Sequence, residues 1–211
     1  MMRAAVFIRY RSGDGFGHVG WAFDAGDGRV EAGSVENHSG HVFTPATGMG
    51  FWDDRSADPV DQMRKRGYDD LKWVEVQNAD PVRAHRTVLW IKHEAYKVLH
   101  RNCEDDAYDV LRAYGVQHLR WPTIFWFPKS WFGRFRGTLE HVAEFEWKAD
   151  TPRLRSAPLD FARGGSIPRH DSDALRATDM PWRPTWRRQW HPHSYLLNLR
   201  RLAQFFGVAR H

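Results

Sequence analysis

Three side chains in this sequence have the types that thiol catalysis requires. Cys103 is the only cysteine among the 211 residues, and His18 and Glu31 supply an imidazole and a carboxylate. In such chemistry the histidine takes the thiol proton while the sulfur attacks a carbonyl carbon, and a third polar group orients the ring. A cysteine nucleophile is therefore possible if the fold brings these three side chains together.

The sequence around Cys103 is typical of the start of a helix. Asn102 is a good N-cap residue, three acidic residues follow at 104–106, and Gly115 is a suitable C-terminal stop. The positive end of the helix dipole can lower the pKa of a thiol placed there. The three carboxylates oppose that effect, so a nearby imidazolium would be the main stabiliser of a thiolate.

His18 and Glu31 fall on two segments that predict a β-hairpin. Residues 18–24 alternate as a strand does, 25–28 read Ala-Gly-Asp-Gly as a turn, and 29–35 form a second run. We expect the pairing of these strands to bring His18 and Glu31 towards each other.

The remaining segments predict a mixed chain of strands and helices. The segment 36–59 reads as irregular, and 149–180 reads as a wrapping segment or linker. Asp80 and Pro81 are typical of the cap and first residue of a helix that runs to about Leu99. Further elements are expected as strands at 2–9 and 71–77, a helix at 60–66, a strand or short helix at 137–148, and an amphipathic helix at 194–208.

These motifs resemble a known superfamily in their order. His-Val-Gly on one strand, Val-Glu-Ala on the next and Asn-Cys-Glu at a helix start are similar to the circularly permuted papain-like hydrolases. These are NlpC-type enzymes, which include relatives of lecithin–retinol acyltransferase, and the resemblance covers roughly residues 2–127. The acyltransferase branch usually has histidine as its third member, whereas this chain has Glu31, which favours the hydrolase branches.

The resemblance implies an α+β fold in which a small antiparallel sheet packs on helices, with a C-terminal extension. The catalytic domain would span 1–148 and the extension 149–211. Cys103 would be the nucleophile, His18 the base and Glu31 the orienting residue, with no cofactor or metal required. The Cys103 backbone N–H would donate to the oxyanion, and Asn102 and Tyr10 are candidates for the second donor. The implied reaction is hydrolysis of an amide bond, in a peptide or isopeptide substrate, through a thioester.

Each of these residues also has a structural interpretation. A lone cysteine is often a small buried hydrophobic residue, and a strand histidine can be a hydrogen-bonded core residue. Glu31 can be an ordinary solvated strand residue. Two functional alternatives follow: a lipid thioesterase or acyltransferase acting at a membrane surface, and a non-catalytic binding module of the same fold.

The net charge of +5 comes from the end of the chain, because 181–211 contains six arginines and no acidic residue. Tryptophans alternate with these arginines, which suits a membrane surface better than nucleic acid, although the tail can instead pack on the domain. The histidines of 38–41 and 191–193 lack the spacing and acidic partners of a metal site. The sequence shows no signal peptide, so we expect a cytoplasmic protein, with non-classical export as an alternative.

Overall fold

The computed structural model describes residues 1–37, 49–93, 102–122 and 127–147, and these form an α+β fold around one six-stranded sheet. All neighbouring strands are antiparallel, in the order β4-β3-β2-β1-β5-β6. The strands are β1 (Met2–Arg9), β2 (His18–Asp24), β3 (Val30–Asn37), β4 (Met49–Ser56), β5 (Asp70–Val76) and β6 (Thr138–His141).

The predicted hairpin of β2 and β3 is confirmed. Gly26 and Gly28 have φ angles of 84° and 79°, which glycine adopts without a steric penalty. In the register of the pair, Phe23 lies opposite Glu31 and Trp21 lies opposite Gly33. Every residue of β2 is buried, because this strand runs through the middle of the sheet and both faces are covered.

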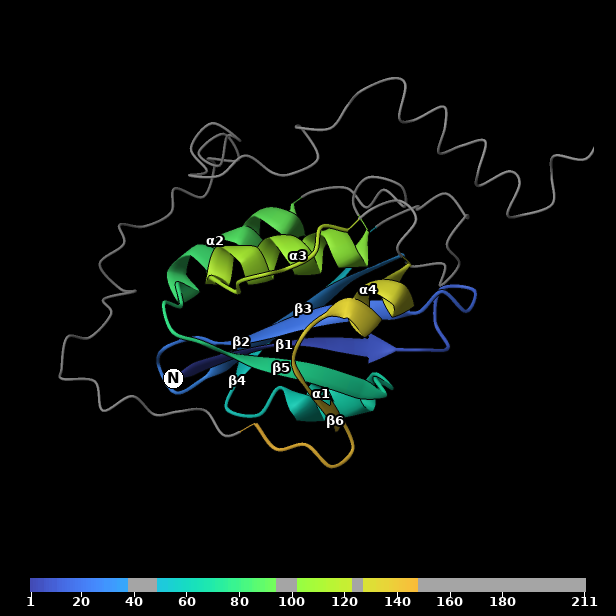
Figure 1. Ribbon diagram of the computed structural model, residues 1–211, viewed down its shortest axis with the longest axis horizontal. Coiled ribbons are helices and arrows are strands. Elements are labelled where there is room, and N and C mark those ends of the chain that lie inside the picture. Colours follow the sequence, from blue (N-terminus) through green and yellow to red (C-terminus); the bar gives the residue numbers. More distant parts are fainter. Residues whose placement is uncertain (38–48, 94–101, 123–126, 148–211) are drawn as a thin grey trace, which may run out of the picture. The chain divides into compact units, whose positions relative to one another are not determined.

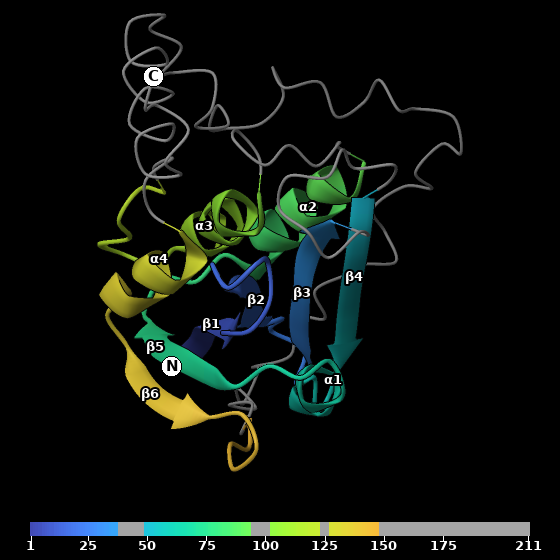
Figure 2. The same cartoon turned by 90° about the vertical axis from the view of Figure 1, so that its right-hand side faces the viewer.

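Helices cover the sheet unequally. Figures 1 and 2 show α2, α3 and α4 on one face and α1 on the other. The cap residues predicted from the sequence are confirmed: the Asp80 side chain accepts from the Arg83 N–H, and Gly115 ends α3 with a φ of 108°. The helices are α1 (Val60–Lys65), α2 (Pro81–Lys92), α3 (Cys103–Tyr114) and α4 (Pro128–Arg134).

The face that carries α1 has its own hydrophobic cluster. Ala22 and Phe7 of the sheet pack there with Met63 of α1 and with Tyr68 of the connection between α1 and β5. The cluster also contains Val142, Phe145 and Trp147 from the chain after β6. The Trp147 indole donates to Asp24 Oδ1 at 2.7 Å, which ties this last described segment to the end of β2.

Two elements differ from the sequence-based expectations. The segment 36–59, expected to be irregular, contains β4, and α4 lies in a segment for which no element was expected. β4 is an edge strand and carries Asp53, Asp54 and Arg55, residues with low strand propensity or high charge, so its pairing with β3 decides its conformation. The segment 137–148 contains the short strand β6, which pairs with β5.

Three segments considered in the sequence lie outside the described residues: the end of the long helix before Cys103, the histidines at 38–41, and the whole of 149–211. Within the described part of the chain, no helix has the length and apolar character needed to cross a bilayer.

Candidate functional site

Cys103 is the first residue of α3, as the sequence predicts. Asn102 Oδ1 accepts from the backbone N–H groups of Glu104 and Asp105 at 2.9 and 3.2 Å. Asp105 Oδ2 accepts in return from the Asn102 N–H at 3.2 Å, which completes a capping box. Two of the first N–H groups of the helix are thus satisfied by Asn102, and Cys103 is fixed at the positive end of the helix dipole.

The Cys103 sulfur lies against β2, beside the backbone of the residue that follows His18. The N–H of Val19 donates a hydrogen bond to the sulfur. The thiol is 4% exposed, and burial raises its pKa. The Val19 N–H opposes this increase, whereas Glu104, Asp106 and Asp105 add to it, so the resting thiol is protonated at neutral pH.

His18 is the first residue of β2 and is held by two side chains of β3. Its Nε2 lies 2.5 Å from Ser34 Oγ and 3.3 Å from Glu36 Oε1. Ser34 Oγ donates its own proton to the Val19 carbonyl at 3.2 Å, so it accepts from the histidine. These contacts assign the proton of the neutral ring to Nε2, which leaves Nδ1 as the basic nitrogen.

The charges of this pair follow from its surroundings. Burial lowers the pKa of His18 below its ordinary value, although Glu36 opposes that decrease. Burial raises the pKa of Glu36, but His18, Arg9 and Arg66 outweigh it and lower the pKa to about 2. At neutral pH the site therefore contains a neutral imidazole beside an ionised carboxylate.

Glu31 does not meet His18, so the predicted contact between them is wrong. Glu31 is opposite Phe23 in the register, about five residues or roughly 16 Å along β2 from His18. It is 1% exposed, and its Oε2 lies 2.8 Å from Nδ1 of His85 on α2. The acidic residue that reaches His18 is Glu36, which occupies the position expected for Glu31.

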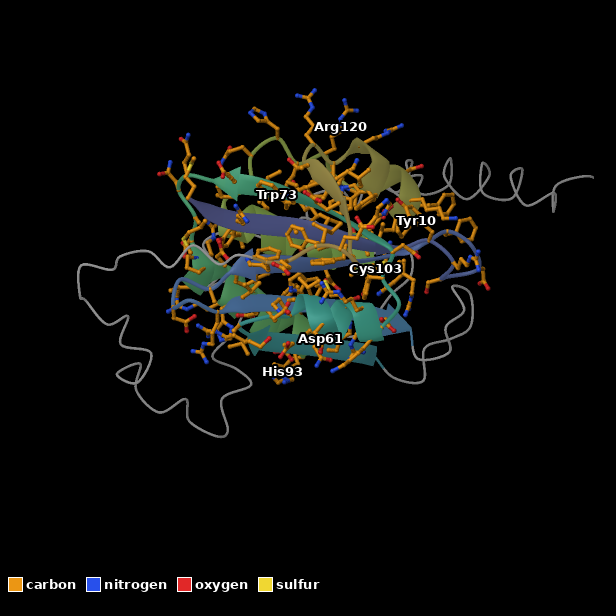
Figure 3. The ribbon with its side chains drawn as sticks, turned by 90° about the horizontal axis from the view of Figure 1, so that it is seen from below. Tyr10, Asp61, Trp73, His93, Cys103 and Arg120 are labelled. Atoms are coloured by element: carbon orange, nitrogen blue, oxygen red, sulfur yellow. The ribbon has the colours of Figure 1, made fainter. Side chains whose placement is uncertain are left out.

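The two candidates for a second oxyanion donor have other partners. Asn102 uses its side-chain oxygen and its backbone N–H in the capping box. The Tyr10 hydroxyl donates to Asp70 Oδ2 at 2.9 Å, and its backbone N–H donates to Asp69 Oδ2 at 2.7 Å. Figure 3 labels Tyr10 and Cys103, which lie towards the same end of the sheet, but these bonds direct Tyr10 to the start of β5.

Tyr68 is a further residue of the site that the sequence analysis did not single out. It lies in the connection between α1 and β5, it is buried, and its ring centroid lies 5.9 Å from that of His18. Burial raises its pKa, and the charges of Glu36 and Cys103 raise it further. A Cβ added to Gly20 would lie 3.2 Å from the Tyr68 hydroxyl, so the glycine makes room for it. Tyr68 thus lies within the electrostatic reach of both the thiol and the His18 pair.

The sequence contains a usable signal for Glu36, since counting residues across the turn at 25–28 would place the partner of His18 near 35 or 36. It contains no such signal for Tyr68, whose position depends on the pairing of β1 with β5. No local pattern connects residue 68 with either strand of the hairpin.

The described residues supply a buried thiol, a neutral imidazole and an ionised carboxylate, which are the groups that thiol catalysis uses. No hydrogen bond joins the Cys103 sulfur to the His18 ring among the described residues, both of which border the Val19 backbone. The same part of the chain contains no group of three or more His, Cys, Asp or Glu residues placed to hold a metal ion. Comparisons with protein-family models, curated proteins and solved structures found no match.

Proposed function

We propose that this chain is a cysteine hydrolase of permuted papain-like fold, which cleaves an amide bond in a peptide or isopeptide through a thioester. The observation that carries the proposal is the hydrogen bond from the Val19 N–H to the Cys103 sulfur, because the residue before Val19 is His18, whose Nε2 faces the Glu36 carboxylate. The capped helix start, the neighbouring base and its acidic partner have the division of roles that thiol catalysis requires.

The reaction begins from two neutral groups rather than from a preformed ion pair. Burial keeps the Cys103 thiol protonated and His18 neutral. As the sulfur attacks the carbonyl carbon, His18 Nδ1 takes the thiol proton, and the carbonyl π electrons move to oxygen. The imidazolium then gives this proton to the leaving amine as the C–N bond breaks. Water, deprotonated by His18, hydrolyses the thioester and restores the thiol.

Glu36 has the orienting role in this scheme. Its carboxylate faces Nε2, so it stabilises the imidazolium that forms when Nδ1 accepts the proton. Ser34 fixes the same ring nitrogen and is itself fixed by the Val19 carbonyl. The attacking sulfur and the basic Nδ1 must approach to hydrogen-bond distance in the substrate complex, a tightening that is common when substrate binds.

The backbone N–H of Cys103 is the first donor to the oxyanion. Asn102 caps the N–H groups of the next two residues, and the Cys103 N–H points from the positive end of α3. Tyr68 is our candidate for the second donor, because its hydroxyl lies beside Gly20 and its pKa responds to the Cys103 charge. A high pKa keeps this hydroxyl protonated and able to donate.

One observation favours the alternative of a non-catalytic module. The thiol is 4% exposed and its pKa is raised, both of which reduce its reactivity towards reagents in solution. In that case the His18–Glu36 pair would only stabilise the sheet. No described residue favours the lipid thioesterase or acyltransferase alternative, which rests on 181–211.

The decisive test is acylation of the full-length chain by p-nitrophenyl acetate. We expect a stoichiometric burst of nitrophenolate, with the acetyl group located on Cys103 by peptide mass spectrometry. Cys103→Ala should abolish the burst while its circular dichroism spectrum stays unchanged. Absence of a burst from the folded wild-type chain, or acetylation elsewhere with Cys103 unmodified, would establish the binding module instead.

A further inference from the structure

A hollow of about 500 Å³ is lined in part by Arg9, which contacts Glu36 of the proposed site. Arg9 and the loop from Arg11 to Asp14 line one side, and Gly67 and Asp69 line the other. In Figure 1 this loop is the blue one that extends beyond the end of β1. A Cβ added to Gly67 would have no atom within 4 Å, so the absence of side chains there keeps the hollow open.

Arg9 connects the hollow to the histidine. Its Nη2 lies 3.6 Å from Glu36 Oε1, and Glu36 faces His18. The same guanidinium donates to the Arg66 carbonyl at 3.0 Å and to Ser12 Oγ at 3.1 Å, so it is held in place. A group bound in the hollow would therefore be connected to the proposed general base through two side chains, Arg9 and Glu36.

Some of the charged side chains that line the hollow already have partners within the protein. Arg9 has Glu36, and Asp69 accepts from the Tyr10 N–H at 2.7 Å. Arg11 is exposed, and it has no ion-pair partner among the described residues. Its planar guanidinium offers two parallel N–H donors, which match a carboxylate. Asp14 also lines the hollow, and its negative charge limits the expected affinity to the millimolar range.

We propose that the hollow is a subsite that binds a carboxylate of the substrate through Arg11. The assignment of this carboxylate to a substrate rests on the proposed hydrolase function. With this subsite the substrate would be an acidic peptide or isopeptide. Its carboxylate would bind at Arg11 while its amide carbonyl reaches Cys103. Arg9 stays paired with Glu36 and forms the wall between the two positions.

Binding can be tested without turnover in the full-length Cys103→Ala chain. Backbone amide shifts are followed by NMR during titration with glutarate, with its neutral analogue glutaramide, and with inorganic phosphate, at constant ionic strength. We expect saturable shifts at Arg11 to Asp14 and at Gly67 with glutarate, at a Kd near 1 mM, and none with glutaramide. Stronger binding of phosphate than of glutarate would overturn the carboxylate assignment.

Arg11→Gln is the variant that tests the subsite, with Arg120→Gln, another exposed arginine, as the matched control. Arg11→Gln should weaken glutarate binding about tenfold or more, and Arg120→Gln should leave it unchanged. Equal binding to both variants, or no saturation by about 20 mM glutarate, would overturn the subsite. Acetylation of Cys103 is measured separately, so a failed subsite and a failed hydrolase give different results.

Discussion

The strand β3 carries two glutamates that each pair with a histidine, in opposite surroundings. Glu36 meets His18 of β2, and Glu31 meets His85 of α2. In the first pair the histidine side chain is 8% exposed and the glutamate 28%, whereas in the second they are 29% and 1%. The two glutamates are five residues apart, so they project from opposite faces of the strand.

The histidine is the more buried partner in the first pair and the glutamate is the more buried partner in the second, so we expect different roles for the two pairs. A buried histidine stays neutral at neutral pH and can accept a proton, while its more exposed carboxylate stays ionised. In the other pair the buried carboxylate needs His85 as its partner, so the contact fastens α2 to the sheet. The chemical types are the same, and the burial of the two partners differs.

Removing each histidine in turn gives the largest expected contrast. His18→Ala should slow acetylation of Cys103 by p-nitrophenyl acetate by about 10²- to 10⁴-fold, because the base is lost. His85→Ala should leave the rate of acetylation of the folded protein close to wild type. It should lower the free energy of unfolding by about 1–3 kcal/mol, because Glu31 loses its partner inside the protein. Similar rates for the two variants would remove the distinction between the pairs.

Neutralising each glutamate sharpens the same comparison. Glu36→Gln should lower the deacylation and acylation rates by about 10- to 100-fold, the equivalent of a charged hydrogen bond worth about 1.5–3 kcal/mol. Glu31→Gln should leave both rates within about twofold of wild type, since it lies roughly 16 Å along the strand from His18. Stopped-flow measurement of the burst and steady-state phases checks both. A larger loss in Glu31→Gln would restore Glu31 as the functional acid.

The pH dependence of stability gives the smallest effect. The pKa of His18 is lowered from 6.5, so the unfolded chain binds more protons just below that pH, and stability falls as the pH decreases. The Glu36 pKa falls from 4.5 to about 2, which adds a second loss as the pH passes downward through that range. Each group contributes at most about 1.4 kcal/mol per pH unit.

Urea unfolding between about pH 2 and about pH 8 measures these slopes, because this range covers the ordinary and the lowered pKa of Glu36. His18→Asn should flatten the slope below pH 6.5, and Glu36→Gln should flatten it only below about pH 4.5. Unchanged slopes in His18→Asn would show that the ring is not held neutral by burial. That result would contradict the starting state of the proposed reaction.

Local sequence determined the elements around the site. Asn102, the acidic first turn and Gly115 defined α3, because caps and stops act through hydrogen bonds within a few residues. The alternation in 18–24 and the glycine turn defined the hairpin for the same reason. β4 was missed because its polar residues are strand-forming only when paired at the edge of the sheet.

The identity of the acid depended on one count along the hairpin. The register of a hairpin fixes every pair of cross-strand neighbours at once, and the number of residues in the turn sets that register. The expected hairpin pairing and the family resemblance selected Glu31, whereas the observed contact of His18 is with Glu36. The period of two then placed Glu31 on the opposite face, where His85 meets it.

The sequence by itself determined that a lone cysteine begins a capped helix and that a histidine begins a strand of a hairpin, since both follow from short-range rules. Only the tertiary structure decided that the sulfur meets the Val19 N–H, that Glu36 rather than Glu31 pairs with His18, and that Tyr68 joins them. The physical reason is that these contacts join residues from separate elements, and strand register and packing, not local propensity, set such distances.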